Sequence, residues 1–228
     1  MCGRYTLSTP SDLLADLMEV EEAPELAARY NIAPTQEAPI LRLSGDSATE
    51  RELRLLKWGL VPFWADDPAI GNRMINARSE SVAEKPSFRT SFKKRRCAVL
   101  ADGFYEWQKT GSGKQPFFFR LKSRRPFGMA GLWDRWEKGE GQPLETFTIL
   151  TTSPNELVAE AHHRMPVILS QADLGRWLDP EADARSDFEA LWDPYPVAEM
   201  EGFPVSTYVN SPANDTPRCI EPLRLSEG

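Results

Sequence analysis

Hydrophobic and polar positions divide the chain into a helical start, a long β-rich middle and a mixed final third. Leu13, Leu14, Leu17 and Met18 recur at helical spacing. Residues 8–11 precede them with capping side chains and with a proline suited to a first helical turn. This pattern predicts an early helix.

From residue 38 to residue 132 the pattern changes to short runs rich in β-branched and aromatic residues, which is typical of strands. A polar, glycine-containing segment at residues 109–114 predicts a hairpin loop between two of these runs. The predicted strands are residues 39–43, 52–58, 97–101, 104–108, 116–121 and 127–133.

The final third alternates between the two kinds of pattern. A predicted strand at residues 146–151 leads into a capping sequence at residues 153–156, where a helix begins that runs to about residue 161. Two more helices are predicted at residues 172–178 and 185–192, and a last strand at residues 203–209. The sequence of residues 215–228 gives little indication of structure or function.

Together these elements predict an α+β fold, in which a curled, mainly antiparallel β-sheet, barrel-like or two-layered, is flanked by helices. The 228 residues, 41% hydrophobic and 27% charged, suit a single domain over residues 1–228, without repeats or linkers. No segment approaches the roughly 18 apolar residues needed to cross a bilayer, so we expect a cytoplasmic protein with no membrane partner.

Cysteine content and charge narrow the chemistry. Cys2, Cys97 and Cys219 are odd in number and far apart, which excludes a disulfide framework and a C-x-x-C zinc site, so we expect free thiols and no metal. A net charge of −7 argues against coating nucleic acid through bulk electrostatics. Any DNA contact must be local. Residues 93–96 and 122–125 are basic enough to supply it, although such runs are also typical of solvated turns.

Cys2 is the most informative position. Removal of an initiator methionine before a small residue would expose an α-amine with a pKa of about 7.7–8.0 beside a thiol of about 8.5. A free aminothiol meeting an aldehyde forms an imine, and its thiol then closes a five-membered thiazolidine ring. The alternative is a cysteine packed as a small hydrophobic residue.

Several sequence blocks are arranged in an order that resembles the SRAP (SOS response-associated peptidase) family, and the resemblance covers nearly everything from Cys2 to about residue 214. The blocks are MCGRY at residues 1–5, RYNIAP at 29–34, WGLVPFW at 58–64, INARSE at 75–80, ADGFYEW at 101–107, QPF at 115–117, HHRMP at 162–166 and VNS at 209–211.

The resemblance implies a protein that bonds covalently, through Cys2, to the aldehyde of an abasic site in single-stranded DNA. It implies no metal and no organic cofactor, and we expect a monomer. A β-elimination side reaction of the imine would make the protein an abasic-site lyase.

By the same resemblance, Asn76 is an active-site asparagine that holds the Cys2 amine or a sugar hydroxyl; the alternative is a turn asparagine. Glu106 would move protons. Strand alternation places it on the face opposite Tyr105 and Trp107, where partial burial would raise the pKa of its carboxyl group. Alternation alone equally permits an outward-facing glutamate.

The family pattern His-x-Arg-x-Pro places His162 in the active site, where an imidazole with a pKa near 6.5 would protonate the sugar ring oxygen. The second histidine, His163, departs from the usual pattern, so spacing alone leaves an exchange of roles open. A pair of histidines at a helix end is also typical of favourable dipole interaction.

The predicted DNA contacts are of two kinds. Arg78 and Arg164 would grip phosphates, and Arg4 of the opening block belongs to the same interface. Trp64 and Trp107 would stack on bases that flank the lesion, although most tryptophans are expected in the core.

Two rival functions stay open. One is a cysteine peptidase in which Cys2 is the nucleophile and His162 its base, acting on its own leader or on other substrates. The other is a non-covalent module that binds the lesion without bonding to it.

Overall fold

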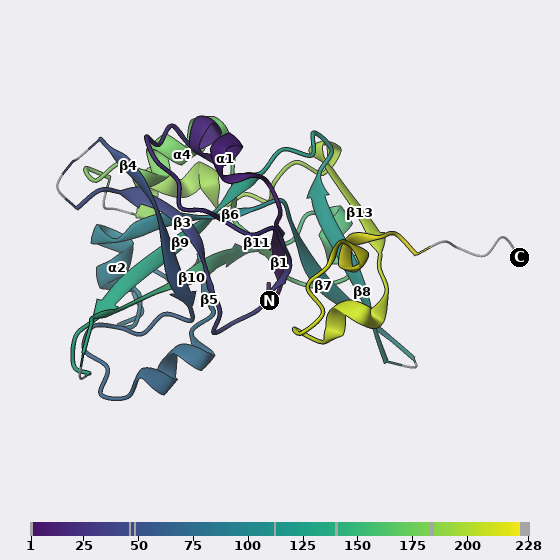
Figure 1. Ribbon diagram of the computed structural model, residues 1–228, viewed down its shortest axis with the longest axis horizontal. Helices are drawn as coiled ribbons and strands as arrows, with labels where there is room; N and C mark the ends of the chain where they lie inside the picture. Colours follow the sequence, from purple (N-terminus) through teal and green to yellow (C-terminus); the bar gives the residue numbers. More distant parts are fainter. Residues whose placement is uncertain are drawn as a thin grey trace, which may run out of the picture.

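The computed structural model describes residues 2–45, 47, 49–111, 113–139, 141–182 and 185–223. Within them, a first set of strands includes five that close into a barrel, and a second sheet lies beside it (Figure 1). The strands of the first set are Glu37–Leu43 (β3), Arg51–Trp58 (β4), Asn76–Arg78 (β5), Arg96–Ala101 (β6), Phe127–Trp136 (β9), Leu144–Thr152 (β10), Met165–Pro166 (β11) and Ile168–Leu169 (β12).

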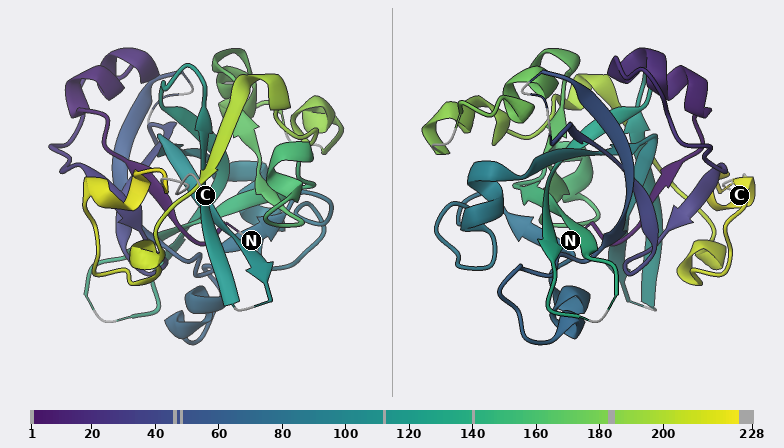
Figure 2. Two further views of the ribbon diagram at one scale, coloured as in Figure 1. Left: turned by 90° about the vertical axis from the view of Figure 1, so that its right-hand side faces the viewer. Right: turned by 60° about the vertical axis from the view of Figure 1, so that its left-hand side comes forward.

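The barrel closes because β9 pairs with β10 at the ends of the order β10-β4-β3-β6-β9 (Figure 2, right). β10 pairs in parallel with β4 along its first half and with β5 along its second half, whereas β11 joins it antiparallel on the other side. The C-terminal half of β10 therefore lies between β5 and β11.

The second sheet has the order β13-β8-β7-β1-β2, and all its pairings are antiparallel. β1 runs beside β7 with Tyr5 opposite Phe104, so the chain that precedes β1 passes alongside Glu106. The strands of this sheet are Tyr5–Leu7 (β1), Arg29–Ile32 (β2), Gly103–Thr110 (β7), Gly113–Leu121 (β8) and Met200–Pro204 (β13).

Helices lie at the margins, with α1 and α4 together at the top of Figure 1 and α2 beside the barrel. The α-helices are Ser11–Met18 (α1), Arg89–Lys94 (α2), Glu156–Ala159 (α3) and Gln171–Leu178 (α4). Single 3₁₀ segments occupy Pro68–Arg73, Arg185–Leu191, Val197–Glu199, Thr207–Asn210 and Pro217–Ile220.

Alternate side chains of β7 face two different cores. Phe104 belongs to the main core, which fills the barrel and the space between barrel and sheet. Tyr105 packs in a smaller cluster with Phe118 and Cys219, on the face that the C-terminal segment covers. The sheet is thus buried on both faces, and Glu106 shares the face of Phe104.

The α+β fold with a curled, mainly antiparallel sheet is confirmed, and so are the early helix, the strands of the β-rich middle and the strand at residues 146–151. The predicted hairpin is also confirmed, because β7 and β8 pair up to Thr110 and Gly113; Ser112 lies outside the described residues. Asn155 caps α3 as predicted by accepting a hydrogen bond from the Val158 backbone, but the helix ends two residues earlier than expected.

The last strand was predicted wrongly. The last strand is Met200–Pro204 rather than residues 203–209, because its register follows β8 and the chain then turns into Thr207–Asn210. The helical stretch predicted at residues 185–192 is confirmed as the 3₁₀ helix Arg185–Leu191.

The C-terminal segment also carries more structure than its sequence indicated. Asp215 accepts hydrogen bonds from the backbone of Tyr30 and Asn31, and it pairs with Arg29. Residues 224–228 lie outside the described residues.

Candidate active site

Cys2 is fully buried at the junction between the barrel and the second sheet. Its carbonyl oxygen accepts a hydrogen bond of 2.8 Å from Asn76 Nδ2, and its Sγ lies 3.9 Å from the Arg4 carbonyl oxygen. Burial first, and then the charge of Glu106, raise the pKa of the Cys2 thiol far above its ordinary value. The thiol is therefore protonated at neutral pH, and a thiolate nucleophile is disfavoured.

Asn76 begins β5, beside the second half of β10. The stretch is extended as predicted, so Asn76 and Arg78 share one side while Ala77 is buried on the other. Asn76 Oδ1 is buried and has no hydrogen-bond partner among the described residues. Because Nδ2 already holds the Cys2 carbonyl, Oδ1 is the acceptor that a bound amine or hydroxyl can use.

Glu106 lies on β7 with only 2% of its surface exposed. As predicted, it faces away from Tyr105 and Trp107, which pack with the smaller cluster. Burial raises the pKa of its carboxyl group to about 7. At neutral pH this carboxyl group can therefore both accept and donate a proton.

His162 follows α3, and its Nδ1 lies 3.9 Å from Glu106 Oε2. Nδ1 also lies 3.1 Å from the Arg164 backbone nitrogen and 3.3 Å from the Arg164 carbonyl oxygen. Burial lowers the pKa of His162 to about 4, so the ring is neutral at pH 7 rather than poised near 6.5. His163 stacks on it, with ring centroids 4.3 Å apart.

The predicted DNA-contact residues differ in exposure and in whether their side chains already bind other protein groups. Arg78 is exposed beside the site, and Trp64 is 42% exposed in the loop after β4. Trp107 is half-buried, and its Nε1 donates to Asn210 Oδ1 at 2.8 Å. Arg78 and Trp64 are thus available to DNA as they stand.

Arg4 and Arg164 are both engaged by the protein itself. Arg4 donates to Asn31 Oδ1 at 2.9 Å and to the backbone carbonyls of Val209 and Asn210. Arg164 is only 8% exposed, and Glu80 holds its guanidinium group in a two-point ion pair. A phosphate contact by either arginine would compete with these partners, which the sequence did not indicate.

The basic run at residues 93–96 is largely structural. Arg96 is buried and donates to the backbone carbonyls of Phe92 and Trp177 at 2.7 Å. Arg95 pairs with Asp134 at 2.6 Å. Only the two lysines of the run project from the surface, so it is a weaker source of DNA contacts than its sequence suggested.

Sequence reasoning missed three residues that position this site. Asn31 is fully buried, and its Nδ2 donates to three carbonyls of residues 209–214. Asp134 is buried and accepts a hydrogen bond from the Phe63 backbone, next to Trp64. Glu80 binds Arg164. Asn31 and Glu80 lie inside the sequence blocks quoted above, which was the available signal.

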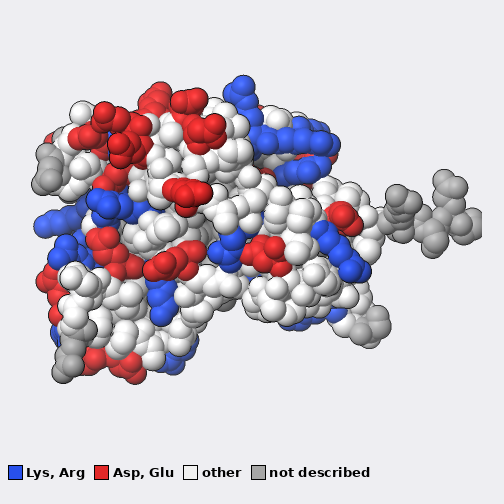
Figure 3. Space-filling model, viewed as in Figure 1, with Lys and Arg blue, Asp and Glu red and all other residues white. Residues whose placement is uncertain are grey.

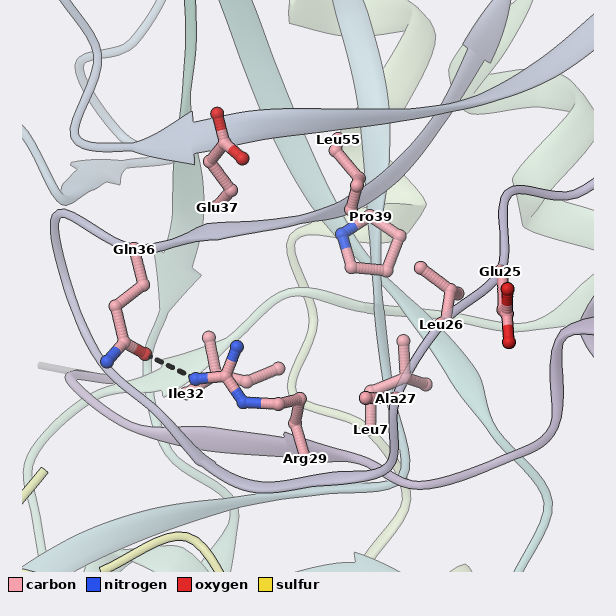
Figure 4. Close-up of a pocket in the computed structure, with 10 residues that line it drawn as sticks. All are labelled: Leu7, Glu25, Leu26, Ala27, Arg29, Ile32, Gln36, Glu37, Pro39 and Leu55. Atoms are coloured by element: carbon pink, nitrogen blue, oxygen red, sulfur yellow. Dashed lines mark hydrogen bonds between the residues drawn. The ribbon is translucent and has the colours of Figure 1, made fainter. Parts of the chain in front are cut away.

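A cavity of about 450 Å³ opens elsewhere, beside β2 and β3. Figure 4 shows Arg29 and Gln36 hydrogen-bonded at one end of it and aliphatic side chains along its wall. None of the predicted site residues lines this cavity. The described part of the chain contains no helix long and apolar enough to cross a membrane, and no cluster of three or more metal-ligating side chains of the His, Cys, Asp and Glu types.

Comparison with known proteins gives a consistent result. The family described as SOS response associated peptidase (SRAP) matches residues 1–212. The chain is 43% identical to the abasic site processing protein YoqW of Bacillus subtilis, over 97% of this chain and 99% of that protein. It is 39% identical to the abasic site processing protein HMCES of Gallus gallus, over 86% of this chain and 66% of that protein.

Among solved structures, the fold is similar to that of a protein from Bacteroides thetaiotaomicron. The TM-score is 0.86 and the sequence identity 30%, with 97% of this chain and 100% of that chain covered. Sequence and fold agree, and this chain belongs to the SRAP family.

Proposed function

We propose that this protein processes abasic sites in single-stranded DNA by bonding to them covalently through Cys2 after removal of Met1. The names of its relatives, abasic site processing proteins, support the substrate. The observation that carries the proposal is the convergence on Cys2 of groups distant in the sequence: Asn76 binds its carbonyl, and the charge of Glu106 acts on its thiol.

The first step is attack by the Cys2 α-amine on the C1′ aldehyde. Glu106, with a pKa of about 7, takes the proton that the ammonium must lose. Neutral His162 carries a ring proton that it can donate to the sugar ring oxygen as the closed sugar opens. Asn76 Oδ1 holds the amine or a sugar hydroxyl in place.

The second step closes the ring. The amine and the aldehyde lose one water to give an imine. The Cys2 thiol then adds to the imine carbon, a carbon–sulfur bond forms, and the thiol proton passes to nitrogen. This step needs no free thiolate in the resting protein, because the thiol proton passes to the imine nitrogen as the carbon–sulfur bond forms.

Single-stranded DNA is the favoured substrate, because an abasic nucleotide there needs no extrusion from a duplex. Arg78 would bind a flanking phosphate, and Trp64 would stack on a flanking base. The imine can also undergo β-elimination, in which loss of a C2′ proton expels the 3′ phosphate. Ring closure consumes the imine and so suppresses this lyase reaction. All the groups come from one chain, so we propose a monomeric active unit.

A cysteine peptidase is the second candidate, supported by the family description. It would need a Cys2 thiolate with His162 as its base. The raised thiol pKa and the lowered imidazole pKa both disfavour that ion pair. The directions of these two pKa shifts therefore favour condensation with an aldehyde over peptide hydrolysis.

The test is incubation of Met1-processed protein with single-stranded DNA that carries one abasic site, followed by denaturing electrophoresis. We expect a stable protein–DNA band that Cys2→Ala abolishes and that Cys219→Ala retains, because Cys219 is buried in the smaller cluster, on the other face of the second sheet from Glu106. A band that survives Cys2→Ala would refute the role of Cys2. Peptide cleavage lost in Cys2→Ala, without any DNA band, would favour the peptidase.

A further inference from the structure

Arg164 joins two parts of the site without touching its reacting groups. Its guanidinium nitrogens donate to Glu80 Oε1 at 2.5 Å and Oε2 at 2.9 Å, and also to the Thr151 carbonyl at 2.5 Å. Arg164 is only 8% exposed, so this charge-assisted ion pair stabilises more than a pair on the surface. Because Glu80 lies two residues after the end of β5, the pair ties the strand of Asn76 to the turn that carries His162.

The backbone of Arg164 also acts on His162. Its N–H lies 3.1 Å from His162 Nδ1, and its carbonyl oxygen lies 3.3 Å from the same ring nitrogen. A backbone nitrogen always carries its proton, so the shorter contact favours a neutral imidazole in which Nδ1 is the acceptor and the ring proton lies on Nε2, whereas the longer contact to the carbonyl oxygen would be satisfied by a proton on Nδ1. The position of the Arg164 backbone relative to the ring therefore sets the balance between the two tautomers of His162.

We propose that Glu80 is a positioning residue which, through Arg164, holds His162 in its Nε2–H form and in register with Glu106 and Asn76. The kinetic part of this inference rests on the proposed function, whereas the tautomer of His162 does not. Glu80 itself is half exposed, so exchanging its carboxylate for an amide of the same shape should leave the fold intact.

The competing role for Glu80 is that of a phosphate surrogate. Its carboxylate occupies the fork that the sequence had suggested for a DNA phosphate. If the carboxylate only kept that fork occupied until DNA arrived, its removal would tighten DNA binding and steepen the dependence on salt. The positioning role predicts slower bond formation instead, so one variant separates the two.

The test compares Glu80→Gln with Glu84→Gln, which makes the same change of charge at an exposed glutamate four residues away. We expect Glu80→Gln to slow crosslinking at saturating DNA about tenfold or more, in line with the effect of misplacing a catalytic group by about 1 Å. DNA affinity, measured in a Cys2→Ala background, should change less than about twofold. Glu84→Gln should match the parent protein.

Nitrogen-15 NMR of the free protein reads the tautomer directly, with the two histidines distinguished by a His163→Gln variant. We expect protonated Nε2 in the parent protein and a mixture of tautomers in Glu80→Gln. An unchanged tautomer with an unchanged crosslinking rate, or tighter DNA binding by Glu80→Gln, would overturn the proposal.

A double-mutant cycle tests whether Glu80 acts through Arg164. In an Arg164→Lys background, Glu80→Gln should slow crosslinking less than about twofold; fully additive effects would contradict the inference. If the parent protein forms no covalent product with abasic DNA, the proposed function fails, and the tautomer measurement still decides the role of Glu80.

Discussion

Glu106 and His162 lie 3.9 Å apart, and burial moves the pKa values of the two side chains in opposite directions. The carboxyl pKa rises to about 7 and the imidazole pKa falls to about 4. From the sequence, the histidine was expected to titrate near neutrality. In the fold, the glutamate is the group that exchanges a proton at pH 7. Burial disfavours both the glutamate carboxylate and the protonated imidazole, so it raises the pKa of the first and lowers that of the second.

Glu106 should make the fold less stable at alkaline pH. Its pKa rises from 4.5 in the free side chain to about 7, so its contribution to stability is present below pH 4.5 and is lost as the pH rises through 7. The Glu106→Gln side chain cannot ionise, so this variant does not lose stability as the pH rises. We expect the variant to be more stable than the parent by about 3 kcal/mol at pH 8, with the difference vanishing near pH 4.5.

Denaturant unfolding of both proteins between pH 4.5 and pH 8 measures this effect, with Glu84→Gln as the control for loss of a carboxylate at the surface. A difference that does not vary with pH would show that the Glu106 carboxyl group is not perturbed. The expected gain of stability on loss of a functional group is typical of active sites.

At the scale of elements, sequence pattern predicted the long strands and failed for the short ones. The runs that became β3, β4 and β6 to β10 are long enough for a recognisable pattern. β1, β2 and β11 have four residues or fewer, and their pairing partners are distant in the sequence, so local pattern carries almost no signal for them.

The short strands nevertheless build the site. β5 carries Asn76 and Arg78, and its parallel pairing with β10 holds it where Asn76 reaches the Cys2 carbonyl. Sequence blocks of the family identified the residues themselves. They did not predict that packing buries Glu106, or that Arg4 and Arg164 already bind partners within the protein. Both facts depend on contacts between segments that are distant in the sequence.

Arg78 should bind DNA through phosphate alone. It is exposed on the same side of β5 as Asn76. Arg78→Ala should therefore weaken the binding of single-stranded DNA and lower the slope of log K against log salt by about 0.7, the value for one phosphate contact. Binding curves at several salt concentrations, in a Cys2→Ala background, measure both quantities.

The control is Arg176→Ala, the loss of an exposed arginine on α4, at the other end of the molecule. It should leave affinity and slope unchanged. Weaker binding by Arg78→Ala with an unaltered salt slope would mean that Arg78 does not contact a phosphate.

At the scale of the whole molecule, the surface charge suits recognition of DNA by a few local contacts rather than attraction by an overall positive charge. The net charge is −7, and on the face shown in Figure 3 acidic side chains gather over α1 and α4 while basic ones form separate patches. No continuous basic surface crosses that face. Under the proposed function, such a protein would gain its specificity from the covalent bond rather than from electrostatic attraction to DNA.

The closed barrel and the second sheet meet where the chain begins, and this junction encloses Cys2. An N-terminal amine is mobile in most proteins. Here the Asn76 hydrogen bond to the Cys2 carbonyl and the pairing of β1 with β7 hold the start of the chain in place. In the proposed reaction, this architecture would preorganise the Cys2 amine as the nucleophile.

Intact mass spectrometry of the product formed with abasic single-stranded DNA tests the central claim most directly. We predict the mass of protein without Met1 plus DNA less one water, unchanged by borohydride because the thiazolidine has no carbon–nitrogen double bond to reduce. Protein with a blocked N-terminus should give no adduct. An adduct that retains Met1, or one formed equally well by the blocked protein, would contradict the account.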